Sequence, residues 1–229
     1  MAGRIAVVDY GMGNLRSVAK ALEHVAPSAR IEVTADASAI AAADRVVFPG
    51  QGAMPDAMRE LTARGLVSVL RDAIAAKPFL GICLGLQALF EHSEEGDCAG
   101  LGVLPGRVRR FAPPAGAHSG GERLKVPHMG WNGVDQVPVS QMLSASALGE
   151  AQHPLWHGIA DGSRFYFVHS YFVEPADPGL VAGTSAYPGR FCCAVARGSL
   201  FATQFHPEKS QTAGLALLRN FVNWDGQAA

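Results

Sequence analysis

Buried strands and amphipathic helices alternate along the first 90 residues of the chain. A strand predicted over 4–9 contains the continuously apolar run Ile5-Ala6-Val7-Val8, as expected for a strand that is buried on both faces. Apolar residues then recur every three or four positions over 15–26, which predicts a helix that ends before Pro27. The alternation continues with strands predicted at 30–34, 45–48 and 78–82 and with helices at 38–43, 55–76 (divided at Gly65) and 84–90. This pattern predicts an α/β fold with a doubly wound, mostly parallel sheet.

The pattern changes after residue 100, where strand-like segments follow one another with few helices between them. Gly198 provides a hairpin turn between the last two of these segments. The predicted strands cover 107–111, 134–137, 164–173, 180–185, 191–197 and 199–205, and a final helix covers 212–224. We expect this antiparallel β section to lie against the sheet of the first half. Two long segments, 112–122 and 138–153, are predicted as loops, and the whole chain, 1–229, is predicted as a single domain.

Cys83 stands between two glycines, in Gly81-Ile82-Cys83-Leu84-Gly85, directly after an apolar run. Small residues on either side of a nucleophile allow the chain to turn sharply from a strand into a helix, with the side chain held at the tip of the turn. The N-terminus of the following helix carries partial positive charge, which favours a thiolate. Similar pentapeptides also occur in ordinary tight turns around a buried cysteine, so this segment alone leaves both interpretations open.

His206 and Glu208 stand two residues apart near the C-terminus, at the end of the strand predicted over 199–205. A carboxylate this close in sequence can orient an imidazole, and the imidazole can then take the proton of a thiol. By itself the pair also fits a plain strand end followed by a polar turn. Together with the turn at Cys83, it predicts a triad of Cys83, His206 and Glu208.

A thiolate that attacks an acyl carbon also needs hydrogen-bond donors for the oxyanion that forms. One candidate is the backbone N–H of Leu84, the residue after the nucleophile. A second is the turn Gly50-Gln51-Gly52, because glycine lets a peptide group swing its N–H inward. This turn also fits a simple connection from strand to helix. Since Gly50 and Cys83 follow successive strands, both are expected at the same edge of the sheet, where such folds bind ligands.

The composition argues against several classes of function. Lys and Arg total 19 and Asp and Glu total 20, for a net charge of −1, so no nucleic-acid surface is predicted. The short basic cluster 107–110 is interpreted as a solvated strand edge, with a partner-facing patch as the alternative. No signal peptide is visible, and no run approaches the ~18 apolar residues of a membrane span.

The four cysteines show no spacing typical of a metal site. Cys98 falls in a predicted loop, whereas Cys192 and Cys193 are expected on opposite faces of one strand. We therefore expect a reduced, cytoplasmic protein that holds no metal and no cofactor.

Three ordered segments match the motifs of a known family. They are Pro49-Gly50-Gln51-Gly52, Gly81-Ile82-Cys83-Leu84-Gly85-Leu86-Gln87 and Gln204-Phe205-His206-Pro207-Glu208. On these motifs the chain resembles class I, triad-type glutamine amidotransferases. Three more segments are similar to the glutaminase subunit of imidazole glycerol phosphate synthase, from histidine biosynthesis, namely 9–17, 126–132 and 165–171. The resemblance then covers nearly the whole chain.

This resemblance implies roles for individual residues. Cys83 would be the nucleophile that forms a γ-glutamyl thioester, His206 the general base and then the acid that protonates ammonia, and Glu208 the residue that orients His206. Gln87 would hold the amino-acid end of L-glutamine. The oxyanion and substrate-binding residues would be Gly50, Gly52, Leu84, Gln87, Ser170 and Tyr171.

The resemblance also implies a partner, a TIM-barrel cyclase subunit that receives ammonia through a tunnel. The residues that would face this partner or gate the tunnel are Asn14, Met129, Trp131, Tyr166 and Lys209. Trp131 and Tyr166 also fit ordinary aromatic packing. Gln51, where many relatives carry valine, and the two long loops depart from the family pattern.

Other interpretations remain open at this point. The triad fits other class I amidotransferase subunits, which serve anthranilate, guanylate or cytidine nucleotide synthesis, although segments 9–17 and 126–132 argue against them. A hydrolase or stress protein with a cysteine at a similar turn, and a non-catalytic scaffold subunit, are further alternatives. Two glycines around one peptide also suggest that segment 49–52 is a switch that a partner moves into a competent form.

Overall fold

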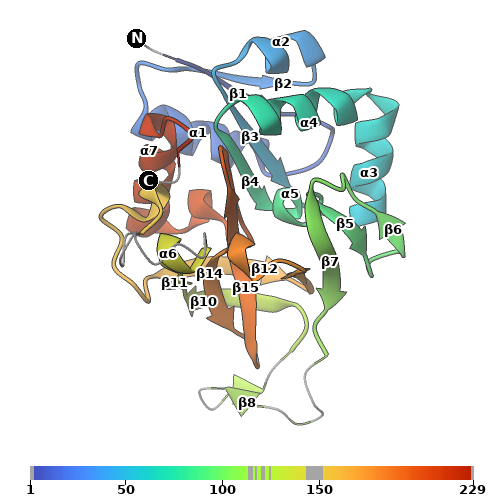
Figure 1. The fold of residues 1–229 in the computed structure, drawn as a ribbon, viewed down its shortest axis with the longest axis vertical. Helices are drawn as coiled ribbons and strands as arrows, with labels where there is room; N and C mark the ends of the chain where they lie inside the picture. Colours follow the sequence, from blue (N-terminus) through green and yellow to red (C-terminus); the bar gives the residue numbers. More distant parts are fainter. Residues whose placement is uncertain are drawn as a thin grey trace.

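A computed structural model describes residues 3–112, 116, 118–119, 122–123, 125–142 and 152–227 of the chain (Figure 1). Its central part is a parallel sheet of β1 (Arg4–Val8), β2 (Arg30–Thr34), β3 (Arg45–Gly50), β4 (Phe79–Cys83) and β16 (Leu200–Thr203). The strands follow the order β2-β1-β3-β4-β16. Because β16 pairs with β4, Thr203 lies opposite Ile82, and the segment that contains His206 follows directly beside the segment that contains Cys83.

A section that is antiparallel except for one parallel pair of strands continues this sheet on the far side of β16. Its strands are β5 (Phe90–Ser93), β6 (Cys98–Ala99), β7 (Leu104–Arg110), β11 (Asp135–Gln136), β13 (Tyr171–Pro175), β14 (Val181–Ala186) and β15 (Arg190–Arg197). The order runs β16-β15-β13-β7-β5-β6, where β7 and β5 form the parallel pair, with β14 also paired to β15 and β11 to β14. The expectation that this section lies against the first sheet is therefore wrong. Within the described residues both sections share one twelve-stranded sheet, because β16 pairs with β4 on one edge and with β15 on the other.

Helices cover both faces of the parallel part. On one face are α1 (Leu15–Val25) and α7 (Gln211–Asn223), and on the other are α2 (Ala37–Ala42), α3 (Met54–Ala63) and α4 (Leu66–Ala76) (Figure 1). Successive strand residues supply the two cores in turn, so Val7 packs with α1 and α7 whereas Val8 packs with the other three helices. Cys193 and Cys192 likewise belong to opposite cores, as predicted.

A separate two-stranded sheet lies beside the large one. It pairs β10 (His128–Gly133) with β12 (Arg164–His169) in antiparallel register, so that His128 lies opposite His169. The prediction of one strand over 164–173 is wrong, because the chain bends at Ser170 and continues as β13 in the large sheet. β10 was not predicted at all, since Gly130 and Gly133 interrupt its apolar pattern.

Several element boundaries also differ from the predictions. The helix expected over 84–90 is only α5 (Leu84–Gln87), because buried Phe90 already belongs to β5. Cys98 lies in β6 and not in a loop. The division at Gly65 is confirmed, since this residue separates α3 from α4 with a φ of +66°. Three 3-10 helices complete the described elements, Pro154–Trp156, Pro178–Leu180 and Pro207–Lys209.

Both predicted loops contain short elements. The segment predicted as a loop over 112–122 includes β8 (His118–Ser119), which pairs with β9 (Glu122–Arg123). The segment over 138–153 begins with α6 (Val139–Met142), and its part 143–151 lies outside the described residues.

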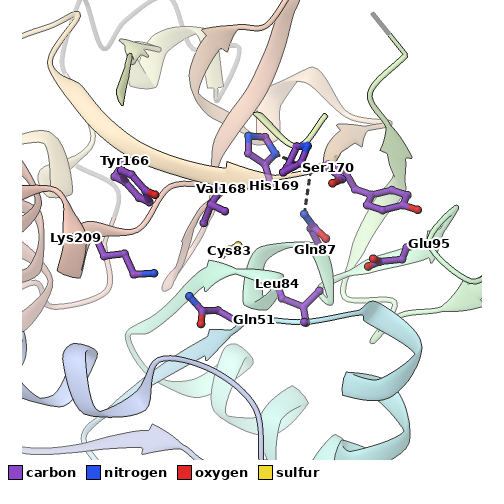
Figure 2. A pocket seen from close by; sticks show the side chains of 13 residues that line it. Gln51, Cys83, Leu84, Gln87, Glu95, Tyr166, Val168, His169, Ser170 and Lys209 are labelled. Atoms are coloured by element: carbon purple, nitrogen blue, oxygen red, sulfur yellow. Dashed lines mark hydrogen bonds between the residues drawn. The ribbon is translucent and has the colours of Figure 1, made fainter. Parts of the chain in front are cut away.

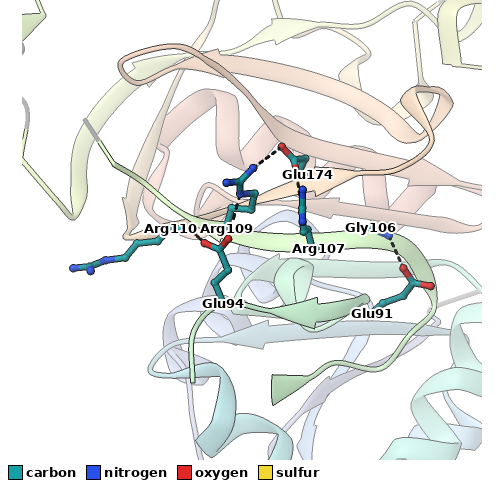
Figure 3. Close-up of polar contacts among 7 residues, drawn as sticks. All are labelled: Glu91, Glu94, Gly106, Arg107, Arg109, Arg110 and Glu174. Carbon is teal, nitrogen blue, oxygen red and sulfur yellow. Dashed lines mark hydrogen bonds and ion pairs between the residues drawn. The ribbon is translucent and has the colours of Figure 1, made fainter. Parts of the chain in front are cut away.

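The basic cluster on β7 lies at the surface and is paired with acidic side chains (Figure 3). Arg107 Nε lies 2.9 Å from Glu174 Oε2, and Arg109 reaches both Glu94 and Glu174 at 3.3 and 3.4 Å. Arg107 and Arg109 are therefore solvated, but β7 is not an edge of the sheet, because it lies between β13 and β5. Exposed pairs of this kind add little to stability. Among the described residues, no helix is long and apolar enough to cross a membrane.

Candidate active site

The turn that carries Cys83 is fixed by close backbone contacts. Cys83 ends β4 with φ +56° and ψ −109°, a strained conformation for a residue with a side chain. A Cβ atom at Gly85 would lie 1.9 Å from the carbonyl oxygen of Phe48, and one at Gly81 would lie 2.9 Å from Cβ of Ala202. Glycine on both sides of the cysteine therefore lets the turn pack directly onto β3 and β16, which is the physical reason for the motif.

His206 and Glu208 form a buried pair just beyond β16. Nδ1 of His206 lies 2.8 Å from Oε1 of Glu208, and both side chains are almost entirely shielded from solvent. A carboxylate can only accept here, so Nδ1 carries the proton and donates it to the hydrogen bond. Among the described residues, Nε2 of His206 makes no fully formed hydrogen bond. This nitrogen is the one left to exchange a proton with Cys83, and such bonds are often long before a substrate is bound.

The charge state of His206 is set by its neighbours. Burial by itself lowers the pKa of His206, but the negative charge of Cys83, its interaction with the imidazole, and Glu208 together raise that pKa to about 10. These neighbours therefore favour the charged form of the imidazole.

The predicted oxyanion donors lie next to the cysteine. Gly50 ends β3 directly opposite Cys83, and Leu84 begins α5. A Cβ atom at Gly50 would lie 2.4 Å from the hydroxyl of Tyr10 and 2.8 Å from Cβ of Leu84. Gly52 has a φ of +106°, which disfavours any other residue. Both glycines are thus required by geometry at the place where the oxyanion is expected.

Tyr10 is a buried residue of this site that the sequence did not reveal. It is fully buried, and its hydroxyl has no hydrogen-bond partner in the described part of the chain. Burial, followed by the charge of Cys83, raises the pKa of Tyr10, so the hydroxyl keeps its proton. The sequence places Tyr10 in the turn after the first strand, within segment 9–17, and nothing there indicated that its side chain would lie beside Gly50 and Cys83.

A cavity of about 430 Å³ opens above the sulfur of Cys83 (Figure 2). Most of the predicted site residues line it, namely Gly52, Cys83, Leu84, Gln87, Ser170, Tyr171, Tyr166 and Lys209. Gln51 of the predicted turn 50–52 also lines it, as do four residues that were not predicted, namely Glu95, Pro127, Val168 and His169. In Figure 2, Tyr166 and Lys209 lie to one side of Cys83, and Gln87 and Glu95 lie to the other.

Gln87 is positioned by two hydrogen bonds of its amide nitrogen. Nε2 donates to the carbonyl oxygen of Tyr171 at 3.1 Å and to Oε1 of Gln204 at 3.0 Å. Both N–H groups are thereby used, so the carbonyl oxygen of Gln87 is the part of this side chain that can meet a ligand.

The residues predicted to face a partner lie in two places. Met129 and Trp131 on β10 are 61 % and 38 % exposed, which is unusual for large apolar side chains in this molecule. Trp131 packs edge-on against Tyr166, and Nζ of Lys209 lies 5.9 Å from the centre of the Tyr166 ring. Asn14 lies apart from this group, at the start of α1. Met129 and Trp131 therefore lie next to a wall of the cavity, whereas Asn14 does not line it in the described structure.

The comparisons with known proteins agree with this geometry. The family model for class-I glutamine amidotransferases matches residues 6–224. The chain is 62 % identical to imidazole glycerol phosphate synthase subunit HisH of Thiobacillus denitrificans, over 98 % of this chain and 93 % of the relative. It is 60 % identical to the HisH subunit of Aromatoleum aromaticum, over 96 % and 98 % of the two chains.

Solved structures of low sequence identity share the fold. A glutamine amidotransferase aligns with a TM-score of 0.67 at 17 % identity, covering 95 % of this chain and 97 % of the other. PurLQS from Thermotoga maritima aligns with a TM-score of 0.64 at 17 % identity, covering 97 % and 99 %. The chain therefore belongs to the class-I glutamine amidotransferase family and, within it, to the HisH subunits of imidazole glycerol phosphate synthase.

Proposed function

We propose that this chain hydrolyses L-glutamine to L-glutamate and ammonia, with Cys83 as nucleophile, His206 as base and acid, and Glu208 as the residue that orients His206. The observation that carries this proposal is the buried His206–Glu208 pair beside a strained cysteine at the floor of a cavity. The cavity volume of about 430 Å³ lies within the usual range of small-molecule sites.

The proposed reaction begins when the Cys83 thiolate attacks the side-chain amide carbon of glutamine. The backbone N–H groups of Leu84 and of the segment 50–52 stabilise the oxyanion. His206 gives its Nε2 proton to the leaving nitrogen, the C–N bond breaks, and ammonia leaves a γ-glutamyl thioester. Water then attacks the thioester as His206 takes a proton from it, and glutamate departs with Cys83 restored.

Recognition of the substrate follows from the groups around the cavity. The carbonyl oxygen of Gln87 and the carboxylate of Glu95 are acceptors suited to the α-ammonium group of glutamine. Ser170 and Tyr171 line the cavity beside Gln87 and offer main-chain and hydroxyl groups to the α-carboxylate of the substrate.

The ammonia is proposed to pass to a TIM-barrel cyclase subunit, which makes imidazole glycerol phosphate and AICAR in histidine biosynthesis. The identity to HisH subunits and the exposed Met129 and Trp131 beside the cavity support this partner. The proposed interface or tunnel gate contains Asn14, Met129, Trp131, Tyr166 and Lys209. We also propose that the 229 residues act as one domain, supported by the continuous sheet, and that the protein works in the cytoplasm, where the catalytic thiol stays reduced.

The segment 49–52 is proposed as a switch that the partner completes. A Cβ atom at Gly50 would meet the side-chain atoms Tyr10 Oη and Leu84 Cβ, and one at Gly52 would meet Met12 Cε. Gly50→Ala and Gly52→Ala should abolish most of the stimulation of glutaminase activity by the partner and its ligand, because a Cβ atom restricts rotation of the two peptide groups between them. Glutaminase rates with and without partner would check this, and stimulation that survives both substitutions would refute the switch.

The proposed function is tested by glutamate release from glutamine. The purified chain is assayed alone, with its cyclase, and with cyclase plus the phosphorylated ribonucleotide acceptor, using Cys83→Ala as control. We expect very low activity alone, a large rise with both additions, and no activity in the variant. High activity that ignores the cyclase would keep the glutaminase chemistry and reject the assigned partner.

A further inference from the structure

An unbroken chain of hydrogen bonds links a histidine on β10 to the sulfur of Cys83. His128 Nδ1 lies 2.9 Å from His169 Nε2, and His169 Nδ1 lies 2.7 Å from the carbonyl oxygen of Tyr171. The same carbonyl oxygen accepts from Gln87, whose amide also bonds Gln204. Nε2 of Gln204 in turn lies 3.6 Å from Cys83 Sγ. The chain therefore runs from the small sheet, through the wall of the cavity, to the nucleophile.

The direction of every bond on the histidine side is fixed by one atom. The Tyr171 carbonyl oxygen can only accept, so His169 must carry its proton on Nδ1. Neutral His169 then accepts at Nε2, and His128 must donate from its own Nδ1. This leaves Nε2 of His128 as an acceptor, and the amide nitrogen of Asn132 lies 3.3 Å from it. Burial lowers the pKa of His128 to about 4 and that of His169 to about 3, which keeps both rings neutral as this arrangement requires.

The same carbonyl oxygen fixes the orientation of two amides. Gln87 must turn its NH₂ group toward Tyr171, and its second N–H then points to Gln204. Gln204 must therefore present its oxygen to Gln87 and its N–H to Cys83. The opposite orientation of Gln204 would place a carbonyl oxygen against the sulfur and would disfavour a thiolate.

We propose that Gln204 is a further catalytic residue that stabilises the Cys83 thiolate through its N–H. His128 and His169 are positioning residues that hold the Tyr171 carbonyl oxygen where it accepts from Gln87, and Gln87 in turn holds Gln204. Gln204 is fully buried, so its amide has little freedom to exchange partners with solvent. A donated hydrogen bond to a charged group is worth about tenfold or more in an equilibrium. The inference rests on the proposed role of Cys83 as the nucleophile.

The position of His128 also couples this chain to the exposed face of β10. His128 is buried, whereas the next residue, Met129, is largely exposed on the other side of the strand. A partner that seats on Met129 therefore acts on the same strand that begins the hydrogen-bond chain.

The inference is tested by the rate of Cys83 alkylation with iodoacetamide in the full-length chain, measured by peptide mass spectrometry at neutral pH. Gln204→Met removes the donor and should slow alkylation of Cys83 about tenfold. His128→Phe keeps an aromatic ring between Phe167 and Tyr187 and should slow alkylation about threefold. His169 can then carry its proton on Nε2 and release the Tyr171 carbonyl that anchors Gln87 and, through it, Gln204. The double variant should be no slower than Gln204→Met alone, since both changes act through one bond.

The matched control is Tyr187→Phe, whose hydroxyl bonds Lys125 and whose ring stacks 4.1 Å from His128 without joining the chain. We expect its alkylation rate to equal that of the parent. If Gln204→Met folds poorly, Gln204→Glu keeps the shape and should slow alkylation further, because a carboxylate oxygen then meets the sulfur.

The alkylation rates distinguish the proposed role of Cys83 from that of Gln204. Alkylation of parent Cys83 no faster than that of Cys98 would reject Cys83 as the activated nucleophile, and with it the proposed function. Fast alkylation in the parent that neither Gln204 variant changes would overturn only the role of Gln204. Losses that add in the double variant would overturn the positioning role of the histidines.

Discussion

Two regions beside the same cavity bury histidines whose pKa values shift in opposite directions. His206 is 1 % exposed, and the pKa of its ring rises to about 10, whereas His169 is 5 % exposed and the pKa of its ring falls to about 3. Burial lowers the pKa in both cases. The difference is that His206 faces Cys83 and Glu208, whereas His169 faces the neutral His128 and a backbone carbonyl.

This contrast indicates how the chain separates chemistry from positioning. A histidine with a buried carboxylate and a thiol can hold and release a proton, which suits acid–base catalysis. The neutral pair of His128 and His169, with fixed tautomers, cannot easily gain or lose a proton. It is suited to fixing the direction of hydrogen bonds. The neighbours of a buried ring, more than its burial, decide which of these tasks it can perform.

The largest expected effect is that of removing a triad side chain. His206→Ala should lower the glutaminase kcat of the complex with the cyclase by about 10⁴-fold or more, because neither thiol activation nor protonation of ammonia has a replacement. His128→Phe should lower it by less than about tenfold, because it only loosens the orientation of Gln204. Steady-state rates for the two variants check this ratio, and equal losses would erase the distinction between the two regions.

A smaller effect is expected when the carboxylate partner of His206 is neutralised. Glu208→Gln should lower kcat by about 10³-fold, because the amide no longer stabilises the charged imidazole. The pKa of His206 should fall in the variant, and a ¹H–¹⁵N NMR titration of the ring nitrogens would measure this directly. An unchanged titration of His206 would mean that Glu208 does not determine its charge.

The smallest effect concerns stability in acid. His128 and His169 have lower pKa values in the folded protein than the ~6.5 of an unfolded chain, so the unfolded state binds more protons as the pH falls. Stability should be fully present above pH ~6.5 and should decrease toward pH 4, by on the order of 2 kcal/mol per histidine at pH 5. His128→Phe should reduce this loss of stability as the pH falls, which urea unfolding at a series of pH values would measure. A free energy of unfolding that falls as steeply with pH as in the parent would contradict the account.

The placement of Cys83, His206 and Glu208 at one end of the sheet could be predicted from sequence, because each residue follows a strand and stands within a short motif. Cys83 follows an apolar run and stands between two glycines, and His206 and Glu208 are two residues apart. Both patterns lie within short segments of the chain, so they are visible in the sequence. The parallel pairing of β4 with β16 brings the two segments together, and this pairing was not predicted, because 199–205 was assigned to an antiparallel section outside the first sheet.

The histidine pair could not be predicted in the same way. His128 and His169 meet only because β10 pairs with β12 in one particular register, and Gly130 and Gly133 hide β10 in the hydrophobic pattern. The strand predicted over 164–173 also concealed the bend at Ser170, which separates the small sheet from the large one. The spacing of apolar residues along the chain does not indicate which residues pair across two strands, or where a strand bends.

The most direct test of the central claim is labelling by a diazoketone analogue of glutamine, which alkylates a nucleophile that lies in a glutamine pocket. The complex with the cyclase is treated with the analogue, with and without excess glutamine, and the labelled peptide is identified by mass spectrometry. The account predicts one label, on Cys83, which glutamine prevents and which His206→Ala slows strongly. Labelling of Cys98 instead, or labelling of Cys83 that glutamine does not prevent, would contradict it.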